Sequence, residues 1–297
     1  MRRYLDHNAT TPLRAEARTA MIAAMDVVGN PSSVHVEGRE AKAIVEKARR
    51  QVAEAIGAEP GEVVFTSGAT EAINLVFAQG WERSACSALE HDAVLRQTRA
   101  LEFDPDGLPL VSRDGVFAGS TPALFQSSTL DLFALTAANS ETGVLQPVEE
   151  VFAALKSVRP QAHRLCDATQ LFGKGRFNFA GVGCEYAAVS AHKIGGPKGV
   201  GALIVRQGVD ITAGISGGGQ ELGRRSGTEN VIGIAGFGAA AEAAANDVRN
   251  DAWNGVAELR NILEKTLEAE TKTTISVGQG AIRLPNTVCF ASPGWKG

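Results

Sequence analysis

The chain has 297 residues, 44% of them hydrophobic, and 29 lysines and arginines against 33 aspartates and glutamates give a formal net charge of −4. This length and composition exclude a disordered or collagen-like chain and allow one large domain or two, with a sizeable core. The mildly acidic balance argues against a nucleic-acid or anionic-membrane partner, and it favours a small-molecule substrate.

The chain carries no recognisable targeting or membrane segment. Its longest uncharged apolar stretch, residues 231–241, is well short of the roughly 20 residues that a membrane span needs. We therefore expect a cytoplasmic protein. The cysteines form no CxxC pair, so we expect buried thiols rather than a disulfide framework or a metal site. They are Cys86, Cys166, Cys184 and Cys289.

Helical patterns alternate with short apolar runs along most of the chain. The apolar spacing predicts a helix that ends at Gly57, a helix that runs through Phe77, and an amphipathic helix over 253–267. The predicted strands are 62–66, 83–88, 130–137, 164–167, 186–190, 200–205, 273–277 and 284–291. This alternation predicts an α/β fold whose mostly parallel central sheet has helices on both faces.

The order of elements also predicts two domains. Residues 1–245 form a large ligand-binding domain, and residues 246–297 form an incomplete α+β domain against which residues 1–12 pack. One helix and two strands bury too little apolar surface to fold alone, so the smaller part must pack on the main body or be an unfinished domain.

Polar residues follow several predicted strands, where open parallel sheets bind their ligands. The segment 66–71 starts a helix, and free backbone N–H groups there favour an anion such as phosphate. Its simpler alternative is helix capping by Ser67. The chain contains no GxxxxGK[ST] or GxGxxG motif, which disfavours the usual nucleotide and dinucleotide sites.

Three titratable side chains occupy similar positions after other strands. Lys193 could form a Schiff base if partly desolvated, Asp167 could pair with a cationic ring nitrogen, and His91 could stack on a planar ligand or move protons. Judged singly, they would be an exposed lysine, a turn aspartate and a structural histidine. Together with a phosphate site, they match what pyridoxal 5′-phosphate requires.

Over nearly its whole length the sequence resembles the NifS/IscS-type cysteine desulfurases of the class V aminotransferase group. The matching stretches are YLDHNATTP (4–12), GNPSS (29–33), FTSGATE (65–71), EH (90–91), ETGV (141–144), DATQ (167–170), SAHK (190–193), GGPKGVG (195–201) and GGGQELGRRSGT (217–228). The resemblance implies fold type I of the pyridoxal-phosphate-dependent transferases and a cytoplasmic homodimer. It also implies a role in sulfur metabolism, such as iron–sulfur cluster assembly, and transfer of sulfur from L-cysteine to an acceptor protein.

The resemblance further implies a role for each matching site residue. Lys193 would bind the cofactor as a Schiff base and later carry protons, while His91 would stack on the ring and assist proton transfer. Asp167 would pair with the ring nitrogen, and Gln170 would hydrogen-bond the ring oxygen. The phosphate would be held by Ala69, Thr70, Ser190 and His192, and Thr228 would reach the phosphate of the other subunit.

Two features depart from the family pattern. Where the family usually has an asparagine before the residue equivalent to Glu141, this chain has the shorter Ser140, which follows Asn139. The family's persulfide-forming cysteine and substrate-carboxylate arginine lie beyond a strand resembling 284–291. We therefore expect a chain that lacks both, binds the cofactor and does not complete the conversion of L-cysteine to L-alanine with an enzyme persulfide.

Three alternatives stay open at this point. The same residues suit another class V enzyme, such as a selenocysteine lyase or an aminotransferase, and they suit a truncated, non-catalytic remnant of the fold. The third is a serine hydrolase, because residues 214–218 match GxSxG around Ser216. A nucleophile elbow needs a strand before the serine and a helix after it, and the glycine-rich, charged residues 219–225 are poor helix material.

Overall fold

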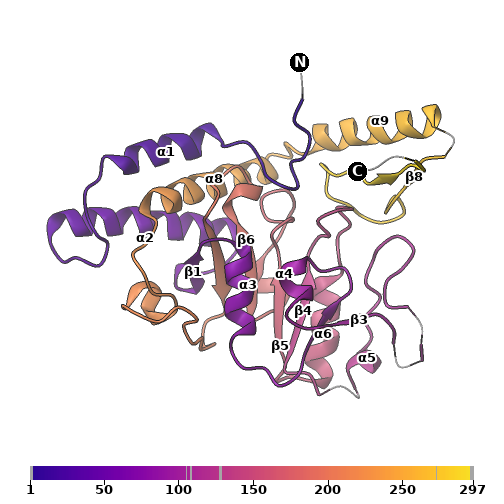
Figure 1. Cartoon of the computed structure of the whole chain (residues 1–297), viewed down its shortest axis with the longest axis horizontal. Coiled ribbons are helices and arrows are strands. Elements are labelled where there is room, and N and C mark those ends of the chain that lie inside the picture. Colours follow the sequence, from indigo (N-terminus) through magenta and orange to yellow (C-terminus); the bar gives the residue numbers. More distant parts are fainter. Residues whose placement is uncertain (1–2, 105, 108, 127–128, 272, 295–297) are drawn as a thin grey trace.

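The computed structural model of the chain describes residues 3–104, 106–107, 109–126, 129–271 and 273–294. Its centre is one seven-stranded sheet (Figure 1). The strands of this sheet are β1 (Val63–Thr66), β2 (Ser84–Ser87), β3 (Arg99–Leu101), β4 (Leu132–Thr136), β5 (His163–Asp167), β6 (Tyr186–Ser190) and β7 (Gly201–Val205).

The strand order is β1-β7-β6-β5-β4-β2-β3. Strands β2 to β6 pair in parallel, whereas β7 is antiparallel to both β6 and β1. The predicted mostly parallel sheet is therefore confirmed. In the register of the three central strands, Thr136 lies opposite Asp167, which lies opposite Ala188. The segments that follow these strands consequently meet at one edge of the sheet.

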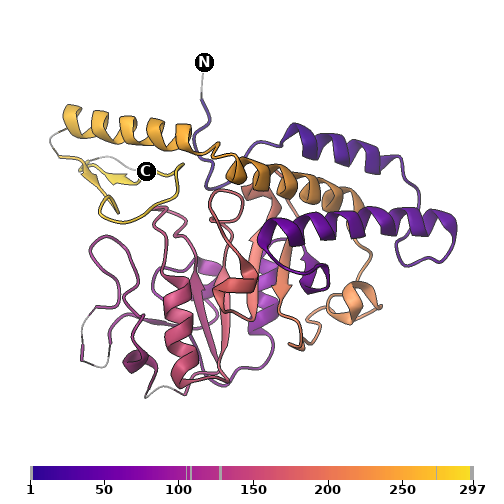
Figure 2. The ribbon, with the colours of Figure 1, turned by 180° about the vertical axis from the view of Figure 1, so that it is seen from behind.

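Helices cover both faces of the sheet, as predicted. One face packs against α3 and α4, and the other packs against α2, α6 and α8, which lie in front in Figure 2. Helix α8 packs against both α2 and α1, so α1 adds to the helices on this second side. The helices are α1 (Ala15–Met25), α2 (Val36–Ile56), α3 (Ala69–Phe77), α4 (Asp92–Leu95), α5 (Pro122–Gln126), α6 (Val148–Val158), α7 (Phe179–Val182), α8 (Val231–Arg249) and α9 (Asn254–Glu270).

The predicted helix boundaries are largely confirmed. Helix α2 ends at Gly57, whose φ of 73° is the left-handed conformation that glycine adopts without a steric penalty. The helix predicted to run through Phe77 ends there, and α9 contains the predicted amphipathic segment except for Trp253, which is its N-cap residue. None of the described helices combines the length and the apolar content that crossing a membrane requires.

Two strand predictions near the C-terminus are wrong in extent. The segment predicted over 284–291 forms only β9 (Phe290–Ala291), paired with β8 (Ile275–Ser276), and Cys289 lies just before it. The earlier part of the segment bonds elsewhere, because the Leu284 N–H donates to the Gly143 carbonyl. Strand β3 was not predicted, since its three residues are exposed or only half-buried and form no apolar run.

The C-terminal elements α9, β8 and β9 lie beside the N-terminal segment, beyond the edge of the sheet (Figures 1 and 2). Asn8 joins the two through its side chain, which bonds to Thr287 and Asn286, each at 2.9 Å. The domain boundary at residues 245 and 246 stays a prediction.

Three of the four cysteine thiols are buried and one is partly buried, and all four are free. The expectation of buried thiols is therefore confirmed for Cys86, Cys166 and Cys184.

A buried ion pair ties the sheet to the 217–228 loop. Arg49 of α2 forms two hydrogen bonds of 2.8 Å with the carboxylate of Glu221, and it also donates to the Val63 carbonyl of β1. Glu221 in turn accepts the backbone N–H of Phe65 at 2.9 Å. The loop thus fastens to the strand that leads into α3, although Glu221 must adopt a φ of 51° to do so.

We predict that Glu221→Ala lowers the free energy of unfolding by about 3–5 kcal/mol, because it leaves the Arg49 guanidinium buried without its carboxylate. Glu46→Ala is the matched control: Glu46 contacts the same guanidinium at 3.2 Å from a more exposed position. Its loss should stay below about 1 kcal/mol. Urea denaturation of both variants measures the difference, and equal losses would contradict the assignment.

Candidate active site

A cavity of about 610 Å³ lies at the edge of the sheet where β4, β5 and β6 end. Eight of the nine predicted site residues line it, although they come from separate segments of the chain. They are Ala69, Thr70, His91, Asp167, Gln170, Ser190, His192 and Lys193. Thr228 does not line this cavity; it lines a smaller one beside Thr66 and Ser67.

The start of α3 forms one end of the cavity. Gly68, not Ser67, is the N-cap residue, so the predicted capping by the Ser67 side chain is wrong; Ser67 instead donates its backbone N–H to Glu71 at 2.7 Å. A Cβ on Gly201 would lie 2.6 Å from the Gly68 Cα, so β7 packs directly against this turn. The first N–H groups of α3 lack helical partners and can hold an anion.

Lys193 lies at the end of β6, in a short 3₁₀ turn. Its Nζ donates a hydrogen bond to the backbone carbonyl of Asn8. Burial lowers the pKa of Lys193, and the carboxylates of Asp167, Asp6 and Glu141 act in the opposite direction. A lowered pKa increases the neutral fraction of the amine, which is the form that attacks a carbonyl carbon.

Asp167, the last residue of β5, lines the cavity. It is only 6% exposed, so the alternative of a solvent-facing turn aspartate is wrong. Its Oδ1 accepts the backbone N–H of Thr169 at 3.0 Å. A buried carboxylate facing a cavity at a sheet edge is suited to a cationic partner.

His91 lines the cavity from the other side of the site. It is the N-cap residue of α4, and its Nδ1 accepts the backbone N–H of Ala93 at 3.0 Å. Because Nδ1 accepts, the neutral ring carries its hydrogen on Nε2. The histidine therefore has a structural task as well as a position in the cavity.

His192 also lines the cavity. Its Nδ1 is 3.2 Å from the Thr10 hydroxyl. Burial lowers the pKa of His192, and the positive charges of Lys193, Lys198 and Lys174 lower it further. The ring is thus held neutral beside a group of lysines.

Asn139 and Ser140 have different tasks. The Asn139 side chain forms hydrogen bonds with the backbone. Its Nδ2 donates to the Leu89 carbonyl at 3.0 Å, and its Oδ1 accepts the backbone N–H groups of Glu141 and Thr142. Ser140 lines the cavity and Asn139 does not. The shorter residue is therefore the one that faces the site.

Sequence reasoning missed Asn8, whose backbone carbonyl accepts from both Gln170 Nε2, at 2.9 Å, and Lys193 Nζ. Its side chain also donates to the Ser140 carbonyl at 3.1 Å. The N-terminal match YLDHNATTP was the available signal, but nothing in the sequence indicated that a backbone oxygen would join these groups.

Glu90 was also missed, although it precedes His91 in a matching pair. It is buried, and its Oε1 accepts from the Ser87 hydroxyl and from the backbone N–H of Thr136, both at 2.7 Å. Its Oε2 has no hydrogen-bond partner within the described part of the chain. Burial raises the pKa of Glu90 to about 8, and the nearby negative charge of Asp167 contributes in the same direction.

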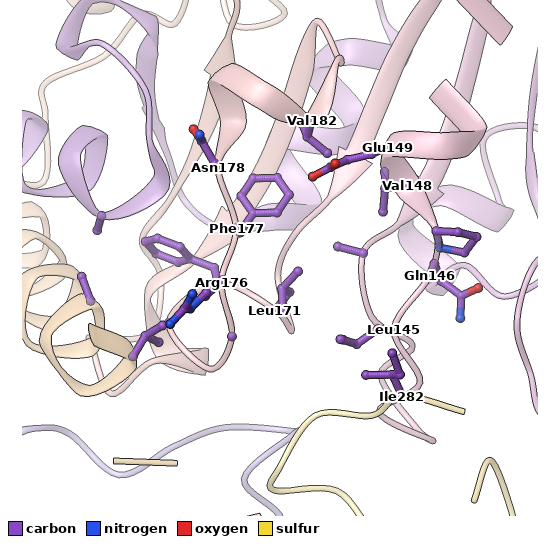
Figure 3. A pocket seen from close by; sticks show the side chains of 18 of the residues that line it. Leu145, Gln146, Val148, Glu149, Leu171, Arg176, Phe177, Asn178, Val182 and Ile282 are labelled. Atoms are coloured by element: carbon purple, nitrogen blue, oxygen red, sulfur yellow. The ribbon is translucent and has the colours of Figure 1, made fainter. Parts of the chain in front are cut away.

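A second cavity, of about 710 Å³, is lined in part by the segment that follows Gln170 (Figure 3). Leu171, Phe177 and Val182 give it an apolar lining, and Ile282 contributes from the C-terminal segment. It is larger than the first cavity but contains none of the predicted site residues.

The structure contradicts the serine hydrolase alternative. Ser216 is exposed, and residues 211–219 form no strand. Only a short 3₁₀ turn, Gln220–Gly223, follows. A nucleophile elbow requires a strand before the serine and a helix after it, and neither is present around Ser216.

Residues 3–296 match the sequence model of the family described as aminotransferase class-V. The chain belongs to the class V aminotransferase family. A cysteine desulfurase from a Frankia species is 40% identical to it, across 96% of this chain and 73% of that protein. Cysteine desulfurase IscS of Dictyoglomus turgidum is 37% identical, across 97% of this chain and 75% of that protein.

Solved structures of the same family share the fold. A NifS-like protein is 35% identical, with a TM-score of 0.89 over 100% of this chain and 83% of that one. A NifS-like protein from Rickettsia africae is 33% identical, with a TM-score of 0.90 over 99% of this chain and 82% of that one. The predicted resemblance and fold class are confirmed.

Glu90 predicts a pH dependence of the stability of this class V family member. Its folded-state pKa of about 8 lies above the ordinary 4.5, so the folded protein holds a proton that the unfolded chain has released between these values. The stability that this group contributes is therefore complete below its unfolded pKa and is lost as the pH rises toward 8.

Glu90→Gln should remove this slope, because the amide keeps an acceptor oxygen and does not titrate. Urea denaturation of both proteins between about pH 5 and about pH 8 measures it. The free energy of unfolding of the unmodified protein should fall more steeply with rising pH than that of the variant. Parallel profiles would contradict the raised pKa.

Proposed function

We propose that this chain is a pyridoxal 5′-phosphate-dependent cysteine desulfurase, whose reaction passes the sulfur of L-cysteine to a cysteine thiol as a persulfide and leaves L-alanine. None of the cysteines of this chain lines the cavity, so the thiol that accepts the sulfur is not assigned to any of them. The observation that carries the proposal is the convergence of Lys193, Asp167 and the start of α3 in one cavity. That this chain belongs to a family whose curated relatives are named cysteine desulfurases supports the same chemistry.

The residues around the cavity fit this cofactor. An anionic phosphate suits the N-terminus of α3 and the hydroxyls of Thr70 and Ser190, and a protonated ring nitrogen suits the buried carboxylate of Asp167. The buried Oγ1 of Thr169, which lines the cavity, has no hydrogen-bond partner among the described residues. A buried hydroxyl without a partner in the protein is consistent with a ligand that supplies one.

When bound, the cofactor supplies an electron-withdrawing ring that stabilises negative charge at the substrate carbon. Each protein group has a distinct task around it. Lys193 would attach the cofactor through Nζ and would move the proton at the substrate carbon. Asp167 would hold the proton on the ring nitrogen, because its negative charge favours the cationic form. His91 would pack against the ring.

The ring oxygen and the phosphate define the orientation of the cofactor. We assign Gln170 to the ring oxygen, and we assign Ala69, Thr70, Ser190 and His192 to the phosphate. All five line the same cavity as Lys193. Two fixed ends hold a planar ligand in one orientation, and such positioning lowers the entropic cost of reaction.

We propose a homodimer in which Thr228 reaches the phosphate site of the second copy. Two observations support it: Thr228 is exposed outside the cavity, and its loop also exposes Leu222 (82%) and Ile215 (48%). Exposed apolar side chains clustered on one loop favour burial against a partner. We further propose a cytoplasmic location and delivery of the sulfur to an acceptor protein, as the sequence predicts.

The substrate proposal has support and a competitor. A structure named SspA in complex with cysteine is 27% identical, with a TM-score of 0.76 over 93% of this chain and 83% of that one. A selenocysteine lyase or an aminotransferase would use the same lysine and aspartate. The products separate them: L-alanine from L-cysteine favours the desulfurase, a keto acid favours an aminotransferase, and L-alanine from selenocysteine alone favours the lyase.

We predict that Lys193→Ala abolishes the yellow, borohydride-reducible band of the protein mixed with pyridoxal phosphate, because it removes the half-buried amine that lines the cavity at the end of β6. Lys198→Ala is the matched control, since Lys198 also lines the cavity but is exposed. Mass spectrometry after reduction should find the cofactor on Lys193. A reducible band in Lys193→Ala would refute the assignment.

We predict that Asp167→Asn lowers the rate of L-alanine formation from L-cysteine, measured with an added thiol that accepts the sulfur, by about 100-fold or more, because a neutral amide does not hold the ring nitrogen protonated. The reducible cofactor band should persist, since Lys193 is untouched. Asp210→Asn, on an exposed residue, serves as the control. An unchanged rate in Asp167→Asn would contradict its role.

A further inference from the structure

Lys174 is a buried lysine that the proposed chemistry does not use. Only 4% of its surface is exposed, and within the described residues it forms no ion pair. Its Nζ donates a hydrogen bond of 2.6 Å to Oε1 of Gln170. Burying an ammonium group without a carboxylate is costly, so its retention calls for a specific task.

The partners of Gln170 determine how its amide is oriented. Its Oε1 faces the Lys174 ammonium, and its Nε2 donates to the Asn8 carbonyl at 2.9 Å. An ammonium group has only donors and a carbonyl has only acceptors. If the amide turned over, its NH₂ group would face the ammonium and its oxygen would face the carbonyl, and both hydrogen bonds would be lost.

Hydrogen bonds and close packing hold the backbone around Lys174 in place. The N–H groups of Lys174 and Gly175 donate to the Leu171 carbonyl at 3.0 and 3.1 Å. Gly173, with a φ of 71°, packs so closely that a Cβ there would lie 2.8 Å from Ile194. Leu171, Gly173 and Gly175 of this turn line the second cavity, whereas Gln170, just before it, lines the first.

We propose that Lys174 is a positioning residue: its ammonium locks the Gln170 amide so that the NH₂ group, and not the carbonyl oxygen, is available to the cofactor's ring oxygen. One hydrogen of that NH₂ group bonds to Asn8, and the second remains for the ring oxygen. This inference rests on the proposed function, because it requires pyridoxal phosphate in the cavity.

The charge of Lys174 is consistent with this role. Burial, with a contribution from the positive charge of Lys193, lowers the pKa of Lys174 to about 7. The ammonium form, which donates most strongly to Gln170, is thus present in a substantial fraction near neutral pH. The neutral amine has a lone pair that could accept from a turned-over NH₂ group, so it is the ammonium form that fixes the orientation of the amide.

The test uses the protein loaded with pyridoxal phosphate and measures the ratio of its two absorbing forms, with the ring oxygen ionised or protonated. A donor at the ring oxygen favours the ionised form. Lys174→Met removes one of the two contacts that orient the amide and leaves the Asn8 carbonyl as the other, so the turned-over amide, which presents Oε1, becomes more populated. We expect it to shift the ratio about fivefold toward the protonated form, the effect of one hydrogen bond.

Two further variants make the outcome specific. In a Gln170→Ala background, Lys174→Met should cause no further shift, because Lys174 acts through the amide that has been removed. Lys174→Arg should keep the ratio within about twofold of the unmodified protein, since it restores a cationic donor. Lys156→Met, on the exposed end of α6, is the control for loss of a lysine elsewhere.

The inference is overturned by an unchanged ratio in Lys174→Met, or by an equal shift in the presence and absence of Gln170. If the proposed function is wrong, the unmodified protein shows no cofactor band at all. That result would overturn the proposed function and this inference together. Thermal unfolding of each variant without cofactor separates a shift in the ratio from loss of the fold.

Discussion

The geometry of the site depends on the hydrogen-bonded register of three parallel strands. Thr136, Asp167 and Ala188 lie side by side in β4, β5 and β6, all of which are buried on both faces. A slip of one residue would turn Asp167 to the opposite face of the sheet. The apolar packing that fixes this register therefore also fixes the carboxylate, the lysine turn after β6 and the loop of Ser140 around one cavity.

The N-terminal segment joins parts of the site through hydrogen bonds of Asn8. The Asn8 carbonyl accepts from Lys193 and Gln170, while its side chain reaches Ser140 and Thr287. A single residue thus joins the lysine turn, the loop after β4 and the C-terminal segment. Movement of this segment would change the surroundings of the amine as well as the fit of the C-terminal elements, so stability and chemistry are coupled here.

Much of this arrangement could be predicted, because buried parallel strands form continuous apolar runs and their polar ends stand out. Asp167 and Lys193 were identified in this way. What could not be predicted depends on contacts that sequence spacing does not encode, such as the Asn8 carbonyl or the pairing of Lys174 with Gln170. The strand predicted over 284–291 was wrong for the same reason: its backbone bonds to a distant loop rather than to a neighbouring strand.

The most direct test of the central claim is a crystal structure of the protein grown with pyridoxal phosphate. The account predicts density continuous from Lys193 Nζ to the cofactor, with the ring nitrogen within hydrogen-bonding distance of Asp167 and the phosphate at the start of α3. Cofactor bound in the second cavity, or in the first with its phosphate toward Asp167, would contradict the assignment of every group in the site.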